Sequence, residues 1–176
     1  IGSDGRITSV AGTGAAGRQR VDDLRPDSMF PSTSDSPPQP RTLAEDGGSA
    51  LLATLAYPTD VALDRDGNVY IADSLHHRIR KVTPAGIIST VAGTGSRGFS
   101  GDGGPATEAS LHFPRMVAIG SDGSLLIGDS SNQRIRRVDP EGTISTLAGA
   151  GTTGEEADGG LAGQALLSYP TGLAVT

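Results

Sequence analysis

Asp73 and Arg78 recur farther along the chain, at the same mutual spacing, as Asp129 and Arg134. Carboxylates that return at a fixed interval can gather around a metal ion or a substrate. An aspartate that shortly precedes an arginine can instead form an ion pair that fixes a connection between two elements. Because the pair returns in each unit, we expect this structural role, since a catalytic site in a repeat protein draws different residues from different repeats.

The adjacent His76 and His77 are a second chemical signal, and Asn132 and Gln133 stand at the equivalent positions. Imidazoles bind metals well, but one loop supplies too few ligands for a site. His112 lies in another connection, and its convergence with the pair stays open. We expect no metal here. The candidate binding residues are Asp73, His76, His77, Arg78, Asp129, Asn132 and Arg134.

The glycine spacing at Gly93, Gly95 and Gly98 matches the fingerprint of a dinucleotide-binding turn. The same spacing begins at Gly12 and at Gly149. A cofactor site needs a helix that opens at the third glycine and an acidic residue about 20 positions on. The segment after Gly98 allows one helical turn and has no such acid. We therefore expect repeated loops and no bound cofactor.

The segment 64–68, DRDGN, begins like a calcium-binding loop. Val69 and Leu75 then occupy the positions where such a loop needs glycine and glutamate. We expect a hairpin turn, for which Asp-Gly is a strong signal.

A basic stripe forms the last candidate for ligand binding, because Arg78, Arg80 and Lys81 return as basic residues at 134, 136 and 137. Such a stripe could hold phosphate groups. The formal net charge of −6 and the neighbouring aspartates favour local pairing instead. Nucleic acid is therefore not an expected partner.

The composition favours many short strands joined by turns. The 176 residues include 26 glycines and 11 prolines, and aromatic residues make up only 3%. The absence of cysteine excludes disulfides and thiolate chemistry. No stretch reaches the roughly 18 apolar residues of a membrane span, so we expect none in this chain.

An internal repeat organises the chain. YPTDVAL, FPRMVAI and YPTGLAV begin at Tyr57, Phe113 and Tyr169, which are equally spaced. DGG begins at 46, 102 and 158 with the same interval, which we call the repeat interval. The pattern of each unit predicts four short strands. In the first unit they lie at 59–64, 67–73, 78–82 and 87–93. A tandem meander of four antiparallel strands is typical of β-propeller blades, so the expected class is all-β.

The pattern FPxxVA…DGxxxIxDxxNxRIRxV resembles the NHL repeat, and AGTG…GFSGDGGPAT between the units resembles the blades of teneurins and of bacterial NHL proteins. His76 departs from the asparagine of that motif. Two blades and two edge strands cannot close a ring alone, so we expect a fragment of a six-bladed propeller. The resemblance favours an extracellular or cell-envelope location.

The predicted organisation has five parts. They are the last strand of a preceding blade (1–14), a disordered insertion rich in proline and serine (15–45), a blade with its leading loop (46–112), a second blade (113–168) and the first strand of a following blade (169–176). We expect the remaining blades to come from a parent chain; self-assembly of copies is the alternative.

The expected function is a non-enzymatic scaffold that binds protein or glycan partners through the face formed by the long connections. Two alternatives stay open. One is part of a metal-dependent, lactonase-like hydrolase, and the other is the sensor domain of a multidomain signalling protein.

Overall fold

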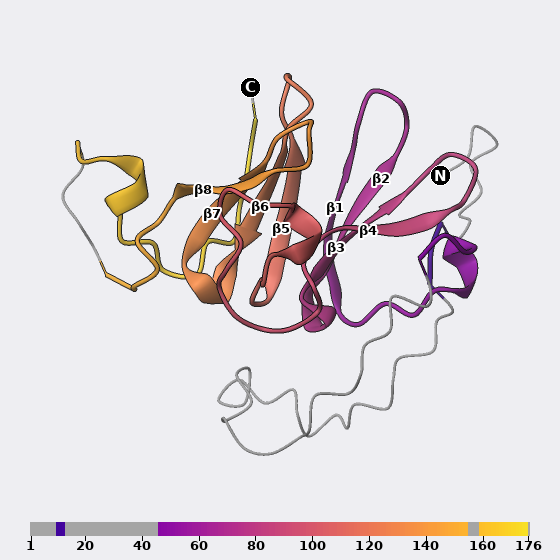
Figure 1. The fold of residues 1–176 in the computed structure, drawn as a ribbon, viewed down its shortest axis with the longest axis horizontal. Coiled ribbons are helices and arrows are strands. Elements are labelled where there is room, and N and C mark those ends of the chain that lie inside the picture. The colour runs from indigo at the N-terminus through magenta and orange to yellow at the C-terminus, as the bar shows by residue number, and fades with distance from the viewer. Residues whose placement is uncertain (1–9, 13–45, 155–158, 176) are drawn as a thin grey trace, which may run out of the picture.

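The computed structural model describes residues 10–12, 46–154 and 159–175, and its strands form two sheets of four (Figure 1). Every neighbouring pair in a sheet is antiparallel and consecutive in the chain. The first sheet contains β1 (Pro58–Leu63), β2 (Val69–Asp73), β3 (Arg78–Val82) and β4 (Ile88–Ala92). The second contains β5 (Pro114–Ile119), β6 (Leu125–Asp129), β7 (Arg134–Val138) and β8 (Ile144–Ala148).

The all-β class and the two four-stranded blades are confirmed, with small shifts at the strand ends. β1 begins slightly early, directly after Tyr57, whose φ of 53° turns the chain into the strand. β2 begins slightly late because Asn68 belongs to the preceding turn, where its side chain donates to Asp64 Oδ2 at 2.7 Å. The hairpin predicted at 64–68 is therefore present. The number of blades in a complete ring stays a prediction.

Short 3₁₀ helices occupy the connections. η3 (Ser74–His76) and η5 (Ser130–Asn132) join the second and third strands of each blade. η2 (Ala50–Leu52), η4 (Ala106–Glu108) and η6 (Ala162–Gln164) lie in the long segments that lead into β1, β5 and the C-terminal end. In the part of the chain that the structure describes, no helix is long and apolar enough to cross a membrane.

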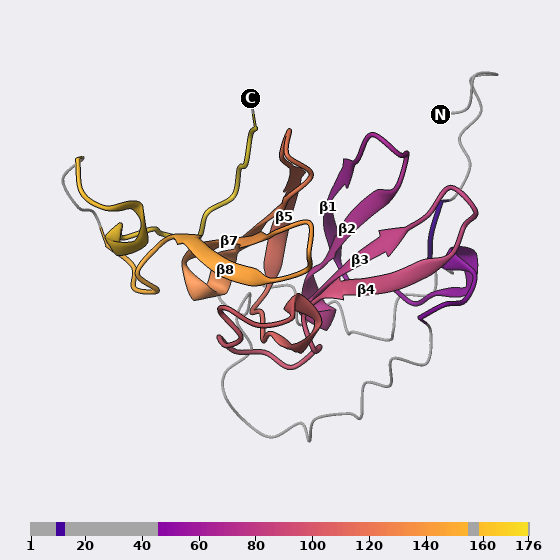
Figure 2. The same cartoon turned by 45° about the horizontal axis from the view of Figure 1, so that its top comes forward.

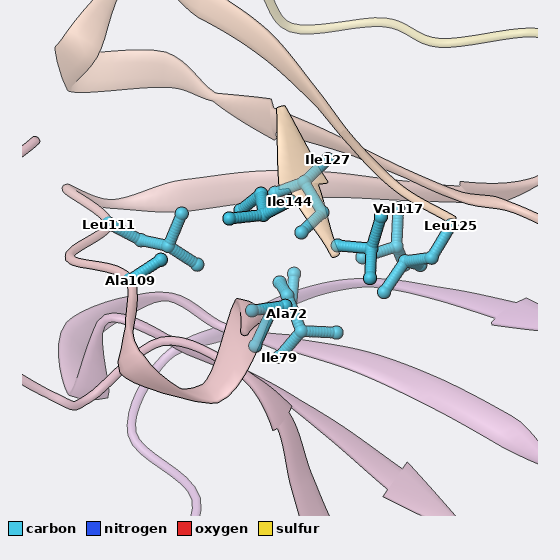
Figure 3. Close-up of a cluster of buried hydrophobic side chains, with 11 residues drawn as sticks. Ala72, Ile79, Ala109, Leu111, Val117, Leu125, Ile127 and Ile144 are labelled. Carbon is cyan, nitrogen blue, oxygen red and sulfur yellow. The ribbon is translucent and has the colours of Figure 1, made fainter. Parts of the chain in front are cut away.

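The two sheets pack face to face, with β1 beside β5 in both views (Figure 2). The space between them holds the main hydrophobic core. Ala72 and Ile79 of the first sheet face Ile127 and Ile144 of the second (Figure 3). Since both sheets contribute apolar side chains, each blade depends on its neighbour for part of its core.

The connection between the blades also covers an open edge. Gly103 N donates to Ile144 O at 2.7 Å, and Ile144 N donates to Gly104 O at 3.0 Å. The segment 102–106 therefore runs along β8, the last strand of the blade that it enters. Gly47 and Gly48 make the same bonds with Ile88 of β4, at 2.8 and 3.0 Å. The first residue of each outer strand is thus paired with the preceding connection, which shortens the edge that is open to pairing with other chains.

Equivalent positions of successive units line one open hollow of about 310 Å³. They are Leu63 at the end of β1, Ile119 at the end of β5, and Val175. The segment 170–175 forms no strand, and Ser130 Oγ donates to Pro170 O at 2.8 Å, as Ser74 Oγ does to Pro114 O at 2.6 Å. Its assignment as the first strand of a following blade stays a prediction. The predicted insertion 15–45 and most of the predicted strand in 1–14 lie outside the described residues.

A substitution at Gly93 tests how closely the chain packs directly after β4. Its φ is +91°, and an added Cβ would lie 2.3 Å from His77 O. Gly103 has a similar φ of +84° with nothing within 4 Å of such an atom. We expect Gly93→Ala to lower the free energy of unfolding by at least about 2 kcal/mol more than Gly103→Ala, measured by urea denaturation. Equal effects would show that the backbone conformation alone matters.

Candidate functional site: the loop face

We define the loop face as the side of the two sheets that carries η3, η5 and the first part of the glycine-rich connection, residues 93–102. The antiparallel order of the strands brings these segments together, because the second-to-third and fourth-to-first connections leave a blade on the same side. The opposite side carries the short turns 64–68, 83–87, 120–124 and 139–143. All seven candidate binding residues lie on or directly beside the loop face.

A buried arginine forms the centre of the second blade. Arg136 is completely buried, and its Nη2 lies 2.7 Å from Asp102 Oδ1 in the connection. Its Nη1 lies 3.4 Å from Asp129 Oδ2 at the end of β6. Asp102 Oδ2 also accepts a hydrogen bond from Thr146 Oγ1 at 2.7 Å. One guanidinium therefore joins the connection, β6 and β7, and Asp102 extends this network to β8.

The first blade repeats this arrangement at the equivalent positions. Arg80 Nη2 lies 2.7 Å from Asp46 Oδ1, and its Nη1 lies 3.9 Å from Asp73 Oδ2. Asp46 in turn accepts a 2.8 Å bond from Thr90 N. The recurrence shows that these carboxylates serve the architecture of each blade.

The structure corrects the predicted pairing of Asp73 with Arg78 and of Asp129 with Arg134. The arginine that reaches Asp129 is Arg136, which lies farther along β7. Arg134 instead donates to Asn132 O at 3.1 Å and to Ala150 O at 2.9 Å. Arg78 likewise turns towards the connection, where it donates to Thr94 O at 3.4 Å. A side chain as long as arginine spans the diagonal of the sheet, so the backbone partner need not be the charge partner.

His76 and Asn132 contact the equivalent buried aspartate in their respective blades. His76 Nδ1 lies 2.8 Å from Asp73 Oδ2, and Asn132 Nδ2 donates to Asp129 Oδ2 at 2.8 Å. The imidazole of His76 therefore takes the place of the asparagine amide of the motif and keeps the same aspartate as its partner. The side chain of His76 is 29% exposed on the loop face.

His77 and His112 meet at the boundary between the blades. Their ring centroids are 5.7 Å apart, and His77 also packs edge-on against Phe113 at 4.9 Å. His77 is buried, and its Nδ1 accepts a hydrogen bond from Phe113 N at 3.1 Å. Burial and the positive charge of Arg97 lower the pKa of His112. Within the described ranges, no three histidine or acidic side chains gather in a metal-binding group.

The connection carries exposed side chains on a firmly held backbone. Phe99 is 44% exposed, and its ring stacks on Arg134, with the guanidinium carbon 3.7 Å from the ring centroid. Gly98 O accepts from Asn132 Nδ2 at 2.7 Å, and Ser100 O accepts from Arg136 Nη2 at 3.1 Å. Arg97, directly before this pair of anchors, is exposed.

Burial sets the protonation of the carboxylate at the centre of the second blade. It raises the pKa of Asp129 to about 6, against the opposing effects of Asn132, the His112 amide and Arg136. Asp122 on the opposite side behaves differently, because hydrogen bonds from Ser124 and Arg137 hold its pKa far below the ordinary value.

Sequence reasoning missed Asp46, Asp102 and Phe99 as parts of the loop face. The two aspartates were visible in the sequence as the first residue of each DGG, with the same interval between them as between Arg80 and Arg136. Two positions that recur together are candidates for contact. Phe99 had no such signal, since Leu43 and Glu155 stand at the equivalent positions.

The geometry of the blades agrees with comparisons to known proteins. The family model described as "Teneurin NHL domain" matches residues 28–100 and 96–176. The chain belongs to this family. The match includes both described blades and the connection that joins them.

Individual relatives cover smaller parts. Human teneurin-4 is 40% identical over an alignment of 100 residues, which covers 49% of this chain and 4% of teneurin-4. NHL repeat-containing protein 2 of Gallus gallus is 34% identical over an alignment of 113 residues, which covers 62% of this chain and 15% of that protein. The chain thus spans only a small part of the curated relatives it matches. The solved structure of an auxiliary nutrient binding protein from Bacteroides thetaiotaomicron matches with a TM-score of 0.53 and 25% sequence identity. The match covers 65% of this chain and 31% of the Bacteroides chain.

The buried arginine network predicts a large difference between two neighbouring arginines. Arg136→Met leaves two carboxylates without their cation, and we expect it to lower the free energy of unfolding by about 3–5 kcal/mol. Arg137 pairs with Asp122 on the surface at 2.8 Å, and we expect Arg137→Met to cost no more than about 1 kcal/mol. Chemical denaturation of both variants measures the difference, and similar costs would contradict a structural role for Arg136.

Asp129 predicts a pH dependence of stability. Its folded pKa of about 6 lies above the ordinary value of 3.8, so it stabilises the fold most below pH 4 and loses this contribution as the pH rises to 6. Asp129→Asn removes the titration. We expect the free energy of unfolding of the wild type, relative to this variant, to fall by about 2 kcal/mol between pH 4 and pH 6. A difference that stays constant with pH would show that Asp129 remains ionised throughout.

Proposed function

We propose that this chain is part of a binding scaffold whose loop face recognises a protein or glycan partner. The observation that supports the proposal most directly is the contrast between exposed and buried groups on that face. Asp73 and Asp129, the carboxylates best placed for chemistry, are fully buried and engaged in the architecture. Arg97 and Phe99 are exposed on a connection whose backbone accepts hydrogen bonds directly before and directly after Phe99.

A rigid backbone beneath exposed side chains lowers the entropic cost of binding. Arginine and aromatic residues are also enriched among the side chains that dominate protein interfaces. Of the seven candidate residues, His76, Asn132 and Arg134 are accessible and belong to the proposed surface. Asp73, His77, Arg78 and Asp129 are buried and position it.

The neighbouring families fit this proposal without specifying a partner. The teneurin and NHL repeat-containing relatives share the blades, and the Bacteroides neighbour is an auxiliary nutrient binding protein. We therefore propose binding without turnover.

Arrays of cell-surface proteins and of glycans, probed with the chain, test the proposed function. We expect Arg97→Glu and Phe99→Ala to weaken binding to a specific hit at least tenfold. Arg65→Glu, an exposed arginine in the 64–68 turn, is the matched control and should leave binding unchanged.

Two outcomes would contradict the proposal. Hits that bind the loop-face variants as well as the wild type would remove the loop face from recognition. Turnover of a lactone by the chain, abolished in the same variants, would favour the hydrolase instead.

A further inference from the structure

The Asp-Gly pairs of this protein can undergo a reaction within the chain itself. Six aspartates are followed directly by glycine, and four of these pairs lie within the described residues, beginning at 46, 66, 102 and 122. The backbone nitrogen of the second residue can attack the side-chain carboxyl group of the first. Glycine favours this attack, because it has no Cβ in the way and its backbone rotates freely. In a folded chain, the outcome depends on how firmly the carboxylate and the nitrogen are held.

The two pairs in the long connections are held at both groups. Asp102 Oδ1 lies 2.7 Å from Arg136 Nη2, and Gly103 N donates to Ile144 O at 2.7 Å. The pair that begins at 46 makes the equivalent contacts with the arginine and the outer strand of the first blade. Neither nitrogen can approach its carboxyl carbon unless an ion pair and a bond to the sheet both break.

The pair in the turn between β5 and β6 is held as well. Asp122 Oδ1 accepts hydrogen bonds from Ser124 N and Ser124 Oγ at 3.0 and 2.7 Å, and Asp122 Oδ2 accepts one from Arg137 at 2.8 Å. These bonds keep the pKa of Asp122 far below its ordinary value, and an ionised carboxylate is a poor electrophile. Gly123 N donates to Gly120 O at 2.9 Å. The side chain of Asp122 is 54% exposed, so its bonds rather than burial protect it.

Asp66, in the turn between β1 and β2, differs from the other three. Its side chain is exposed, and none of the described residues donates a hydrogen bond to its carboxylate or pairs with it. Gly67 N donates to Asp64 O at 3.2 Å, which is the longest of the four glycine bonds. The carboxyl group is therefore free to turn, and the nitrogen is held only by a long bond within the turn.

We propose that Asp66-Gly67 is a site of spontaneous isomerisation to isoaspartate. Gly67 N attacks Asp66 Cγ, the amide proton and the carboxyl hydroxyl leave as water, and a succinimide ring closes. Water then adds to the ring carbonyl that was the main-chain carbonyl of Asp66, and the ring opens there. Gly67 stays bonded to Cγ, so the backbone gains one methylene and the main-chain carbon becomes a free carboxylate. One water leaves and one enters, and no other reactant is needed.

The longer backbone changes the turn that Asp64 organises. Asp64 Oδ1 accepts hydrogen bonds from Asp66 N at 3.0 Å and from Asn68 N at 2.9 Å, so this carboxylate bridges the bond that lengthens. Asp64 and Arg65 also line the open hollow of about 310 Å³. The modification therefore alters the side opposite the loop face, and it does not depend on the ligand proposed for that face.

Peptide mapping of the folded and the unfolded chain tests the inference. The 176-residue chain is incubated at mildly acidic pH, in buffer and in concentrated urea, and isoaspartate at each pair is quantified by electron-transfer fragmentation. In urea we expect the four pairs to react at similar rates, because glycine follows each aspartate. In the folded chain we expect Asp66 to keep most of its unfolded rate and to react at least tenfold faster than the other three, whose reaction requires local opening.

Asp66→Glu is the matched control. It keeps the carboxylate but lengthens the side chain beyond the five-membered ring, so we expect the product at this position to disappear. A folded chain in which Asp66 reacts no faster than the other pairs would overturn the proposal. The same order of rates in urea would also overturn it, since the sequence around each pair, and not the contacts, would then decide the site.

Discussion

A buried guanidinium between two carboxylates is the interaction on which each blade depends. Arg136 lies between Asp102 and Asp129, and Arg80 lies between Asp46 and Asp73. Burying a charge is costly unless it is paired and hydrogen-bonded, so the chain must bring three distant segments together around each arginine. The position of the connection relative to the sheet follows from this requirement.

The remaining features of the loop face follow from the position of the connection. Held by Asp102, the segment 102–106 pairs with the first residue of β8 and with the turn before it. The residues just before it are held by Asn132 and Arg136, which leaves Phe99 and Arg97 exposed on a fixed backbone. The same interactions therefore stabilise the blade and shape the surface that we propose for binding.

The sequence predicts the regular part of this structure well. The constant repeat interval and the alternation of apolar runs with turns locate all eight strands, because strand and turn signals are local. It predicts charge pairing less well, since Arg78 and Arg80 both follow Asp73 and only the three-dimensional path of each side chain distinguishes them. Of the equivalent valines at 61 and 117, the first is exposed and the second is buried for a reason outside the local sequence, namely whether another described sheet covers them.

A double-mutant cycle between Arg136 and Asp102 tests the central claim most directly. Arg136→Met, Asp102→Asn and the double variant are compared by urea denaturation at pH 7. The account predicts a coupling energy of about 1.5–3 kcal/mol, because the two groups share a buried network. Additive effects, within about 0.5 kcal/mol, would show that the arginine and the connection are stabilised independently and would contradict it.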